Sequence, residues 1–205
     1  MPGPADLFVA GLVLAAGGSS RLGRPKQLLP FGPATLLDHT VATARRCSFD
    51  QLVVAVGGAA GAVQDRVDLS GADVVVNEAY GAGCSSSIAA AMDVLHPRAG
   101  LLVLLLGDQP GVSCDTVAAL LAGRGDAPLA VCGYDDGLGH PFCFSHELFP
   151  TLRALHGDKA VWKLVAAGGD AVAEIPVDGP VPIDVDTWAD YEAARRPLAV
   201  RPRGA

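Results

Sequence analysis

The sequence predicts an α/β fold, in which a mostly parallel central sheet lies between layers of helices. Residues 7–16 and 101–106 are almost entirely apolar, which is typical of strands buried on both faces of a parallel sheet. An amphipathic segment at 36–47 lies between such runs, and the order strand, helix, strand indicates right-handed crossovers and a doubly wound sheet. A chain of 205 residues supports one sizeable core, so we expect a single domain over residues 1–196 and a flexible tail at 197–205.

The first half of the chain contains three predicted strands and two predicted helices. After the apolar run at 7–16, a helix over residues 36–47 begins near Thr35 or Asp38 and carries two arginines in its last turn, where they favour the helix dipole. The remaining elements of this half are a strand at 51–56, a short helix at 61–67 and a strand at 73–77.

The second half continues the alternation. Residues 101–106 form the strongest predicted strand, an aliphatic run that ends at Gly107 and Asp108. Thr187 is placed to cap a last helix that begins at Trp188. The other predicted elements are helices at 88–95, 114–122, 148–155 and 161–167, a strand at 128–133, a turn at 135–137 and an extended piece at 174–177.

The composition excludes several classes of protein. Half of the residues are hydrophobic, which is too many for a disordered chain, and the net charge of -7 argues against a general nucleic-acid-binding protein. No apolar run reaches the ~18–20 residues that span a bilayer, and residues 1–6 lack the basic segment of a secretory signal. We therefore expect a cytoplasmic protein without a membrane or nucleic-acid partner.

The cysteines indicate neither a zinc cluster nor a disulfide framework. They are odd in number, widely spaced and contain no C-x-x-C pair. We interpret them as small buried hydrophobic residues, with Cys84 set apart by the serines that follow it. They are Cys47, Cys84, Cys114, Cys132 and Cys143.

A glycine-rich segment follows the first predicted strand. Residues 17–20 are Gly-Gly-Ser-Ser, which leaves the backbone free of bulk, so that successive N–H groups can approach an anion and the hydroxyls add donors. Two cations follow, Arg21 and Lys26. This combination suits a polyphosphate, because the backbone can curl around it while the cations neutralise its charge.

Other interpretations of this segment fit less well. A P-loop requires Ser or Thr after its lysine, whereas Lys26 is followed by Gln27. A dinucleotide-binding fingerprint requires glycines at the first, third and sixth positions, which Gly17, Gly18 and Gly23 do not provide. A plain strand-to-helix turn remains as an alternative, but such a turn does not need both cations.

Two further segments carry candidate chemistry. Residues 77–87 are rich in glycine and serine and precede a predicted helix, so free N–H groups and hydroxyls there suit an anion or a ribose; alternatively, the serines only cap the helix. Asp108 lies at the carboxyl tip of a central strand, where open α/β sheets bind ligands and a carboxylate can hold Mg²⁺. Its alternative role is to form the turn before Pro110. Asp184 and Asp186, two residues apart on an extended segment, are expected to point the same way.

The segment Leu14-Ala-Ala-Gly-Gly-Ser-Ser-Arg-Leu-Gly-Arg-Pro-Lys26 resembles the signature of the MobA-like nucleotidyltransferases, and most closely the molybdenum cofactor cytidylyltransferases. Gly-Asp-Gln-Pro at 107–110 and Gly-His-Pro at 139–141 resemble the same family. Leu22, where close relatives usually carry Met, is a mild departure. The resemblance implies a Rossmann-like three-layer α/β/α sandwich of the nucleotide-diphospho-sugar transferase type.

The resemblance also implies a set of site residues. Arg21, Lys26 and Asp108 are the expected catalytic residues, in which the two cations hold the phosphates and Asp108 binds Mg²⁺. Asp186 is the favoured second metal ligand, and Asp184 is the alternative. The expected nucleotide-binding residues are Leu14, Ala15, Ala16, Gly17, Gly18, Ser19, Ser20, Arg21, Lys26, Asn77, Gly81 and Ser85.

The implied reaction is attack by an acceptor phosphate on the α-phosphorus of an NTP, with release of pyrophosphate and with Mg²⁺ as the cofactor. CTP is favoured over GTP, because relatives that use GTP tend to carry Leu-Ala-Gly-Gly where residues 14–17 are Leu-Ala-Ala-Gly. The implied acceptor is a molybdopterin-type phosphate near His140 and Lys159, and a molybdoenzyme would receive the product. His140 is alternatively a packed, hydrogen-bonded residue.

Two other functions stay open at this point. The same chemistry could act on a sugar phosphate or another phosphorylated acceptor, which assays of pyrophosphate release with each acceptor would distinguish. The chain could instead be a non-catalytic nucleotide- or cofactor-binding chaperone, which would bind the finished cofactor without turnover. A serine hydrolase is excluded, because the segment around Ser19 lacks a Gly-x-Ser-x-Gly elbow.

Overall fold

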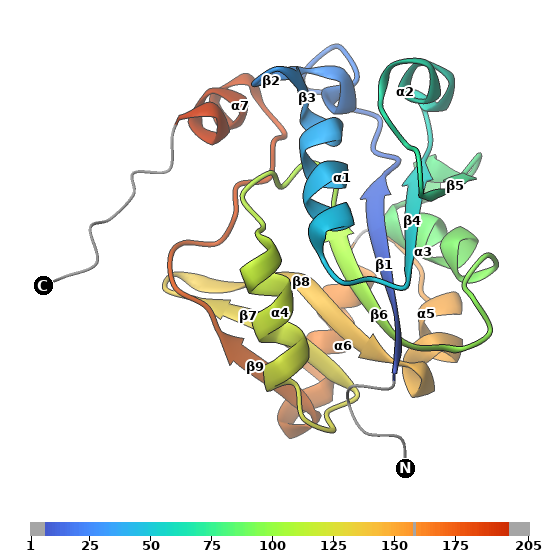
Figure 1. The fold of residues 1–205 in the computed structure, drawn as a ribbon, viewed down its shortest axis with the longest axis vertical. Helices are drawn as coiled ribbons and strands as arrows, with labels where there is room; N and C mark the ends of the chain where they lie inside the picture. The colour runs from blue at the N-terminus through green and yellow to red at the C-terminus, as the bar shows by residue number, and fades with distance from the viewer. Residues whose placement is uncertain (1–6, 158, 197–205) are drawn as a thin grey trace, which may run out of the picture.

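The computed structural model describes residues 7–157 and 159–196, in which the main sheet has seven strands (Figure 1). These strands are β1 (Phe8–Ala15), β4 (Gln51–Val56), β5 (Asp73–Val76), β6 (Ala99–Leu106), β7 (Leu129–Tyr134), β8 (Gly137–Ser145) and β9 (Val172–Pro176). Their order in the sheet is β5-β4-β1-β6-β8-β7-β9, and every neighbouring pair is parallel except those made by β8. A separate small hairpin joins β2 (Pro30–Phe31) to β3 (Ala34–Thr35).

The helices connect these strands. The α-helices are α1 (Leu36–Arg46), α2 (Ala60–Arg66), α3 (Cys84–Met92), α4 (Cys114–Gly123), α5 (Phe149–Arg153), α6 (Ala160–Gly168) and α7 (Trp188–Arg195). The 3-10 helices are η2 (Lys26–Leu28), η3 (Tyr80–Ala82), η4 (His146–Leu148) and η5 (Gly169–Ala171). Helix α1 begins with a capping box in which Thr35 and Asp38 bond each other's backbone N–H groups, so both residues named in the sequence serve its start.

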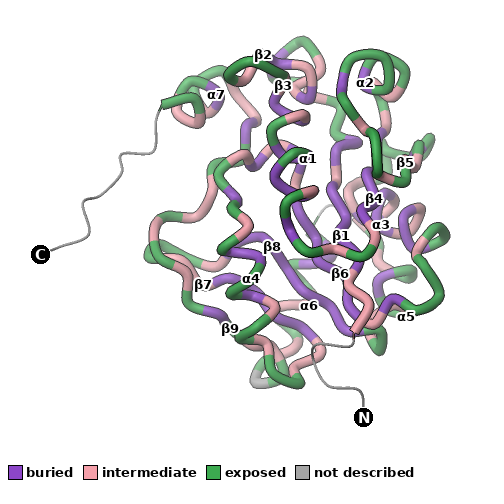
Figure 2. Tube along the Cα trace, in the orientation of Figure 1, coloured by how far each residue is buried: buried purple, intermediate pink, exposed green. Residues whose placement is uncertain are grey.

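The sheet is buried on both faces, with α1 and α4 over one face and α3, α5 and α6 over the other (Figure 1). Alternate residues of β1 show this arrangement: Val13 and Ala15 pack in the cluster that contains α1 and α4, whereas Ala10 and Leu12 pack with α3 and α6. The strands are accordingly buried along most of their length, and exposed residues gather on the outer sides of the helices (Figure 2). The predicted three-layer α/β/α fold with a mostly parallel sheet is confirmed.

Two elements differ from the sequence-based expectation. The turn at 135–137 leads directly into β8, an antiparallel strand that was not predicted because Gly139 and Pro141 interrupt its apolar pattern. Helix α3 begins at Cys84 rather than at residue 88, directly after Gly83, whose φ of 101° ends η3. The serines at 85–87 therefore lie in the first turns of the helix instead of in the loop ahead of it.

The structure bears only in part on two further expectations, which concern the C-terminal tail and membrane-spanning segments. The predicted tail at 197–205 lies outside the described residues. Within the described part of the chain, no helix combines the length and the apolar character that crossing a membrane requires.

Replacing Phe144 with alanine is expected to lower the free energy of unfolding by about 3–5 kcal/mol, because the side chain is fully buried in β8 and its removal leaves a cavity. Urea-induced unfolding measures the loss. Val94→Ala is the matched control: Val94 is 42% exposed, and its truncation should change the free energy by less than about 0.5 kcal/mol. Similar losses in both variants would contradict the burial of β8.

Candidate active site

The loop after β1 is held in shape by side chains that follow it. The Ser19 hydroxyl accepts a hydrogen bond from the N–H of Lys26 at 2.9 Å. The Gln27 amide donates to the carbonyl oxygens of Ala15 at 2.7 Å and Gly17 at 3.0 Å. Gln27 is buried and was not predicted as a site residue; its position directly after Lys26 was the only signal in the sequence. These hydrogen bonds tie residues 26 and 27 back to the loop, so that Lys26 is held close to the end of β1.

Four charged residues from distant parts of the chain meet at this loop. The ammonium of Lys26 donates to the Asp108 carboxylate, 82 residues away in sequence, and to Asp186 at 2.8 Å, 160 residues away. Arg21 pairs with the other Asp186 oxygen at 3.0 Å. Asp108 comes from the end of β6, next to β1 in the sheet, and Asp186 from the segment before α7. The structure thus brings together the expected catalytic residues and the favoured second metal ligand.

The electrostatics of this cluster follow from its geometry. Burial opposes the charge of Lys26, but the carboxylates of Asp108 and Asp186 outweigh this effect, so the pKa of the ammonium lies above its ordinary value. Burial likewise opposes the charge of Asp186, but the hydrogen bond from Lys26 and the nearby Arg21 leave its pKa lowered. Burial of the carboxyl, together with the charges of Asp108 and Asp186, raises the pKa of Asp184 to about 6, although the residue as a whole is exposed to solvent, which weakens this effect.

The donor set at this cluster fits a divalent cation. Asp108 and Asp186 already hold one cation between them, the ammonium of Lys26, so their spacing and charge accommodate a positive ion. Among the described residues, no group of three or more His, Cys, Asp or Glu side chains is placed to hold a metal ion. Two carboxylates completed by phosphate oxygens are the arrangement that Mg²⁺ commonly takes in nucleotide sites. The residues therefore fit a metal that arrives with a phosphate ligand.

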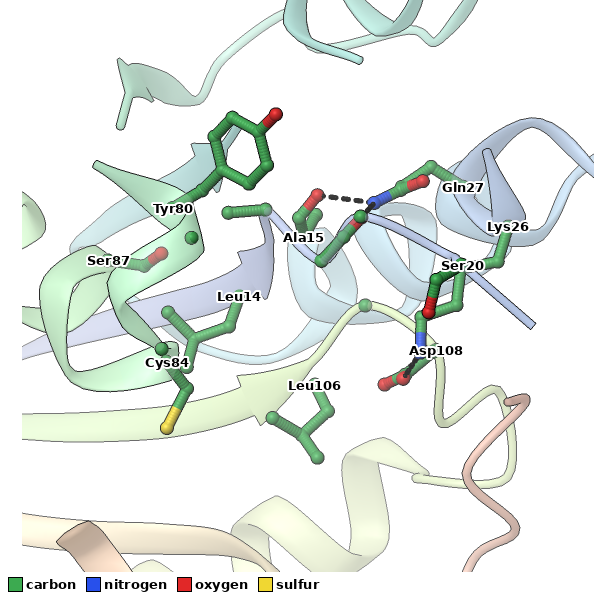
Figure 3. A pocket seen from close by; sticks show the side chains of 16 residues that line it. Leu14, Ala15, Ser20, Lys26, Gln27, Tyr80, Cys84, Ser87, Leu106 and Asp108 are labelled. Carbon is green, nitrogen blue, oxygen red and sulfur yellow. Dashed lines mark hydrogen bonds and ion pairs between the residues drawn. The ribbon is translucent and has the colours of Figure 1, made fainter. Parts of the chain in front are cut away.

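A first pocket of about 490 Å³ lies between the loop after β1 and the start of α3 (Figure 3). Of the expected nucleotide-binding residues, Leu14, Ala15, Ala16, Gly17, Gly18, Ser20, Lys26 and Gly81 line this pocket, as does Asp108. Tyr80 also lines it and was not predicted; the only signal was an aromatic residue inside a glycine-rich segment. The ring of Tyr80 packs closely on Gly58: a Cβ atom added at Gly58 would lie only 2.8 Å from a ring carbon of Tyr80. Tyr80 thus forms an aromatic wall of a size suited to a base.

A second pocket of about 660 Å³ adjoins the first. Both pockets share Lys26, Asp108 and Cys84 in their walls. The second also reaches Trp162, an aromatic residue at 37% exposure that the sequence analysis did not single out, because it reads as one of several apolar helix positions. Of the expected site residues, it adds Ser19, Arg21, His140, Lys159, Asp184 and Asp186.

Two expected nucleotide-binding residues, Asn77 and Ser85, do not line either of these pockets. Both are buried. The Asn77 amide donates to the hydroxyls of Ser86 at 2.8 Å and Ser87 at 2.9 Å, and its oxygen accepts from the N–H of Ala79 at 2.9 Å. These bonds fix the turn before α3, so that in this structure Asn77 shapes the pocket from behind its wall. Direct contact of Asn77 and Ser85 with a nucleotide stays a prediction.

His140 is buried beside Phe142 and Trp162, at ring-centroid distances of 4.2 and 6.0 Å. Burial lowers the pKa of its imidazole to about 4 from an ordinary value of 6.5, so the ring is neutral at neutral pH. Both of its sequence-based interpretations remain compatible with this position, because the ring is packed and also lines the second pocket.

The low pKa of His140 predicts a pH dependence of stability. Below pH 6.5 the unfolded chain takes up a proton on this residue, whereas the folded protein does so only near pH 4, so stability is lost as the pH falls through this range. Between pH 7 and 5 the expected loss is about 2 kcal/mol. Urea unfolding of the wild type and His140→Gln at both pH values measures it. A variant that loses as much stability as the wild type would contradict the prediction.

Comparison with known proteins places these features in a family. The model of the MobA-like NTP transferase domain matches residues 11–172, which include Lys26 and Asp108. The chain belongs to the MobA-like NTP transferase family. Asp184 and Asp186 lie beyond the matched segment, so the family match does not include the carboxylates that precede α7.

Individual relatives agree with this assignment. The structure is similar to that of the Mycobacterium tuberculosis Rv0371c homologue from Mycobacterium sp. strain JC1, with 52% sequence identity, a TM-score of 0.85 and coverage of 91% of this chain and 94% of the other. It is also similar to a complex of Rv0371c with manganese, with 46% identity, a TM-score of 0.84 and coverage of 93% and 100%. A curated relative, nicotine blue oxidoreductase of Paenarthrobacter nicotinovorans, is 34% identical over 74% of this chain and 78% of its own length.

Membership in the MobA-like family supports nucleotidyltransferase activity, and a nucleoside triphosphate substrate is consistent with the family. A divalent metal is consistent with the family, since its relative Rv0371c has been solved with manganese. The names of these relatives do not identify a substrate common to them. The base, the acceptor and the metal of this chain are therefore matters for a proposal.

Proposed function

We propose that this MobA-like protein transfers CMP from CTP to the phosphate of a molybdopterin-type acceptor and releases pyrophosphate, with Mg²⁺ as the cofactor. The observation that carries the proposal is the meeting of two pockets at one cluster, in which both are lined by Lys26 and Asp108. A bisubstrate transfer needs two binding spaces that touch at the reacting phosphorus. The first pocket takes the nucleotide and the second takes the acceptor.

The loop residues hold the triphosphate. Lys26, Arg21, Gly17 and Gly18 all line the second pocket, where the two cations would offset the charge that develops as pyrophosphate leaves and the glycine backbone leaves room for the phosphates. To do so, the two cations exchange their present carboxylate partners for phosphate oxygens. A divalent ion bound by Asp108 and Asp186, or alternatively Asp184, would supply further compensation of phosphate charge.

The acceptor side offers apolar, aromatic and cationic groups. Trp162 presents its ring to the second pocket beside the neutral His140, and Lys159 at the start of α6 can bind the acceptor phosphate. An aromatic wall suits a flat heterocycle, which supports a pterin-type acceptor over a plain sugar phosphate. The product of such a transfer is a cytosine dinucleotide cofactor, for which a molybdoenzyme is the proposed recipient.

The choice of CTP rests on the start of the loop. The sequence at 14–17 is Leu-Ala-Ala-Gly, where relatives that use GTP tend to carry a glycine in place of Ala16. Ala15 and Ala16 both line the first pocket, and a methyl group at residue 16 leaves less room in it than a glycine would. A narrower space supports a pyrimidine over a purine.

The test is a panel of α-labelled NTPs incubated with the protein, Mg²⁺ and molybdopterin, scored for pyrophosphate and for a labelled dinucleotide product. The proposal expects turnover with CTP and molybdopterin. Turnover with GTP alone would overturn the choice of base, and turnover only with a sugar phosphate would overturn the acceptor. Tight binding of the finished dinucleotide without any pyrophosphate release would favour the non-catalytic chaperone.

A further inference from the structure

Two cysteines from different helices meet away from the nucleotide site. Cys47 ends α1 and Cys114 begins α4, and their sulfur atoms lie 3.3 Å apart. Both thiols also lie near the carbonyl oxygen of Thr43, at 3.4 and 3.3 Å. Both helices lie on the same face of the sheet, and α4 begins near the end of α1 (Figure 1). The fold therefore holds two thiols in contact that are 67 residues apart in sequence.

The pair is within reach of small molecules. Cys114 is only partly buried. Cys47 is 6% exposed, but it lines a surface hollow of about 240 Å³ together with Phe49 and Gln51. Cys132 and Cys143, by contrast, are 0% and 1% exposed within the core. A small oxidant can thus approach the first pair from solvent and not the second.

The two thiols differ in their exposure to solvent. Burial and the hydrogen bond to Cys114 raise the pKa of the Cys47 thiol to about 12, so Cys47 stays protonated at neutral pH. Cys114 is the more exposed of the two and meets an oxidant first. Cys114 is therefore the sulfur that is oxidised first, and Cys47, whose sulfur lies 3.3 Å away, is placed to close the disulfide before further oxidation.

We propose that Cys47 and Cys114 are a redox modification site that forms a reversible intramolecular disulfide under peroxide. The Cys114 thiol reacts with hydrogen peroxide, breaking its O–O bond, to give a sulfenic acid and one water. The Cys47 sulfur then attacks the Cys114 sulfur, its proton leaves with the hydroxyl as a second water, and the S–S bond forms. Both sulfurs are oxidised by one electron each while one peroxide is reduced to two waters, and a dithiol reductant reverses the change.

The geometry requires little movement for this bond. A disulfide has an S–S length of about 2.05 Å, so the sulfurs must close from their present 3.3 Å. The bond would join the end of α1 to the start of α4. Both helices lie near the strand end that precedes Asp108, because the Thr40 hydroxyl of α1 donates to the Gly107 carbonyl at 3.3 Å and α4 follows the turn after Asp108.

The experiment treats the full-length reduced protein with an equimolar dose of hydrogen peroxide, followed by alkylation, intact-mass measurement and peptide mapping under non-reducing conditions. The expected result is a monomer lighter by two hydrogen atoms, a fall in alkylatable thiols from five to about three, and one cross-linked peptide pair containing Cys47 and Cys114. Dithiothreitol should restore all thiols. Cys47→Ser and Cys114→Ser should each abolish the product, and Cys84→Ser should keep it.

A control addresses whether the fold directs the pairing. The same dose applied to the chain unfolded in urea should give mixed pairs with no preference for Cys47 and Cys114. Separate alkylation of Cys47 and Cys114 after oxidation of the folded protein would overturn the proposal, as would a cross-link to Cys84 or conversion of Cys114 to a sulfinic acid. Because the mapping is made on the wild type, poor folding of a serine variant does not affect the result.

Discussion

Replacing Asp108 with asparagine is expected to lower the rate of nucleotidyl transfer at least about hundredfold. The asparagine keeps the shape of the side chain at the end of β6 but loses the negative charge that now pairs with Lys26 and that would hold a divalent ion. The loss should appear mainly in kcat rather than in KM for the nucleotide, because Asp108 stabilises charge as the phosphorus is transferred. Steady-state assay of pyrophosphate release across nucleotide concentrations measures both constants.

The matched control for this prediction is Asp93→Asn. Asp93 also forms an ion pair with an arginine, Arg153, but lies outside both pockets with a side chain that is 72% exposed. Its replacement should leave kcat within about twofold of the wild type, since exposed ion pairs contribute little. Asp108→Ala should be folded by circular dichroism and inactive. Near-normal turnover by Asp108→Asn would remove the metal-binding role proposed for this residue.

That the glycine-rich loop and Asp108 lie close together could be predicted from the sequence, because each directly follows a strongly apolar strand. Residues 7–16 and 101–106 are unambiguous as buried strands, and the carboxyl ends of parallel neighbours meet at one edge of the sheet. Any polar groups placed just beyond both strands must therefore lie close together. The ion pair between Lys26 and Asp108 was not itself predicted, because it depends on how the loop after β1 turns back to place Lys26 in η2.

The contributions of Gln27, Tyr80 and Trp162 could not be predicted in this way. Their place in the site depends on which way a loop or helix turns once it is packed, and neither a strand nor a helix period specifies that direction. The position of the Tyr80 ring depends on its close contact with Gly58. The position of Trp162 depends on its contact with Phe142 of the antiparallel strand β8, which the sequence analysis missed. The walls of the pockets thus depend on tertiary packing, whereas the closeness of the glycine-rich loop and Asp108 depends on the order of the strands in the sheet.

Replacing Lys26 with methionine is expected to have two opposite effects on the site. The rate of transfer should fall at least about hundredfold, because a cation that offsets triphosphate charge is lost. Binding of Mn²⁺ in the absence of nucleotide should become at least about tenfold tighter, because the ammonium that now bridges Asp108 and Asp186 no longer competes with the metal for the same oxygens. Electron paramagnetic resonance of free Mn²⁺ measures this second effect independently of turnover.

Lys163→Met is the control for both effects, since it removes an exposed lysine of α6 that lines neither pocket, and it should change neither rate nor Mn²⁺ affinity. The metal measurement distinguishes two explanations of an inactive Lys26→Met. If the variant binds Mn²⁺ more tightly, Lys26 and the metal share the carboxylates, and in the wild type the triphosphate must draw the lysine away before the metal binds fully. If the variant binds Mn²⁺ no better than the wild type, the carboxylates are not the metal ligands, and the lysine acts on the phosphates alone.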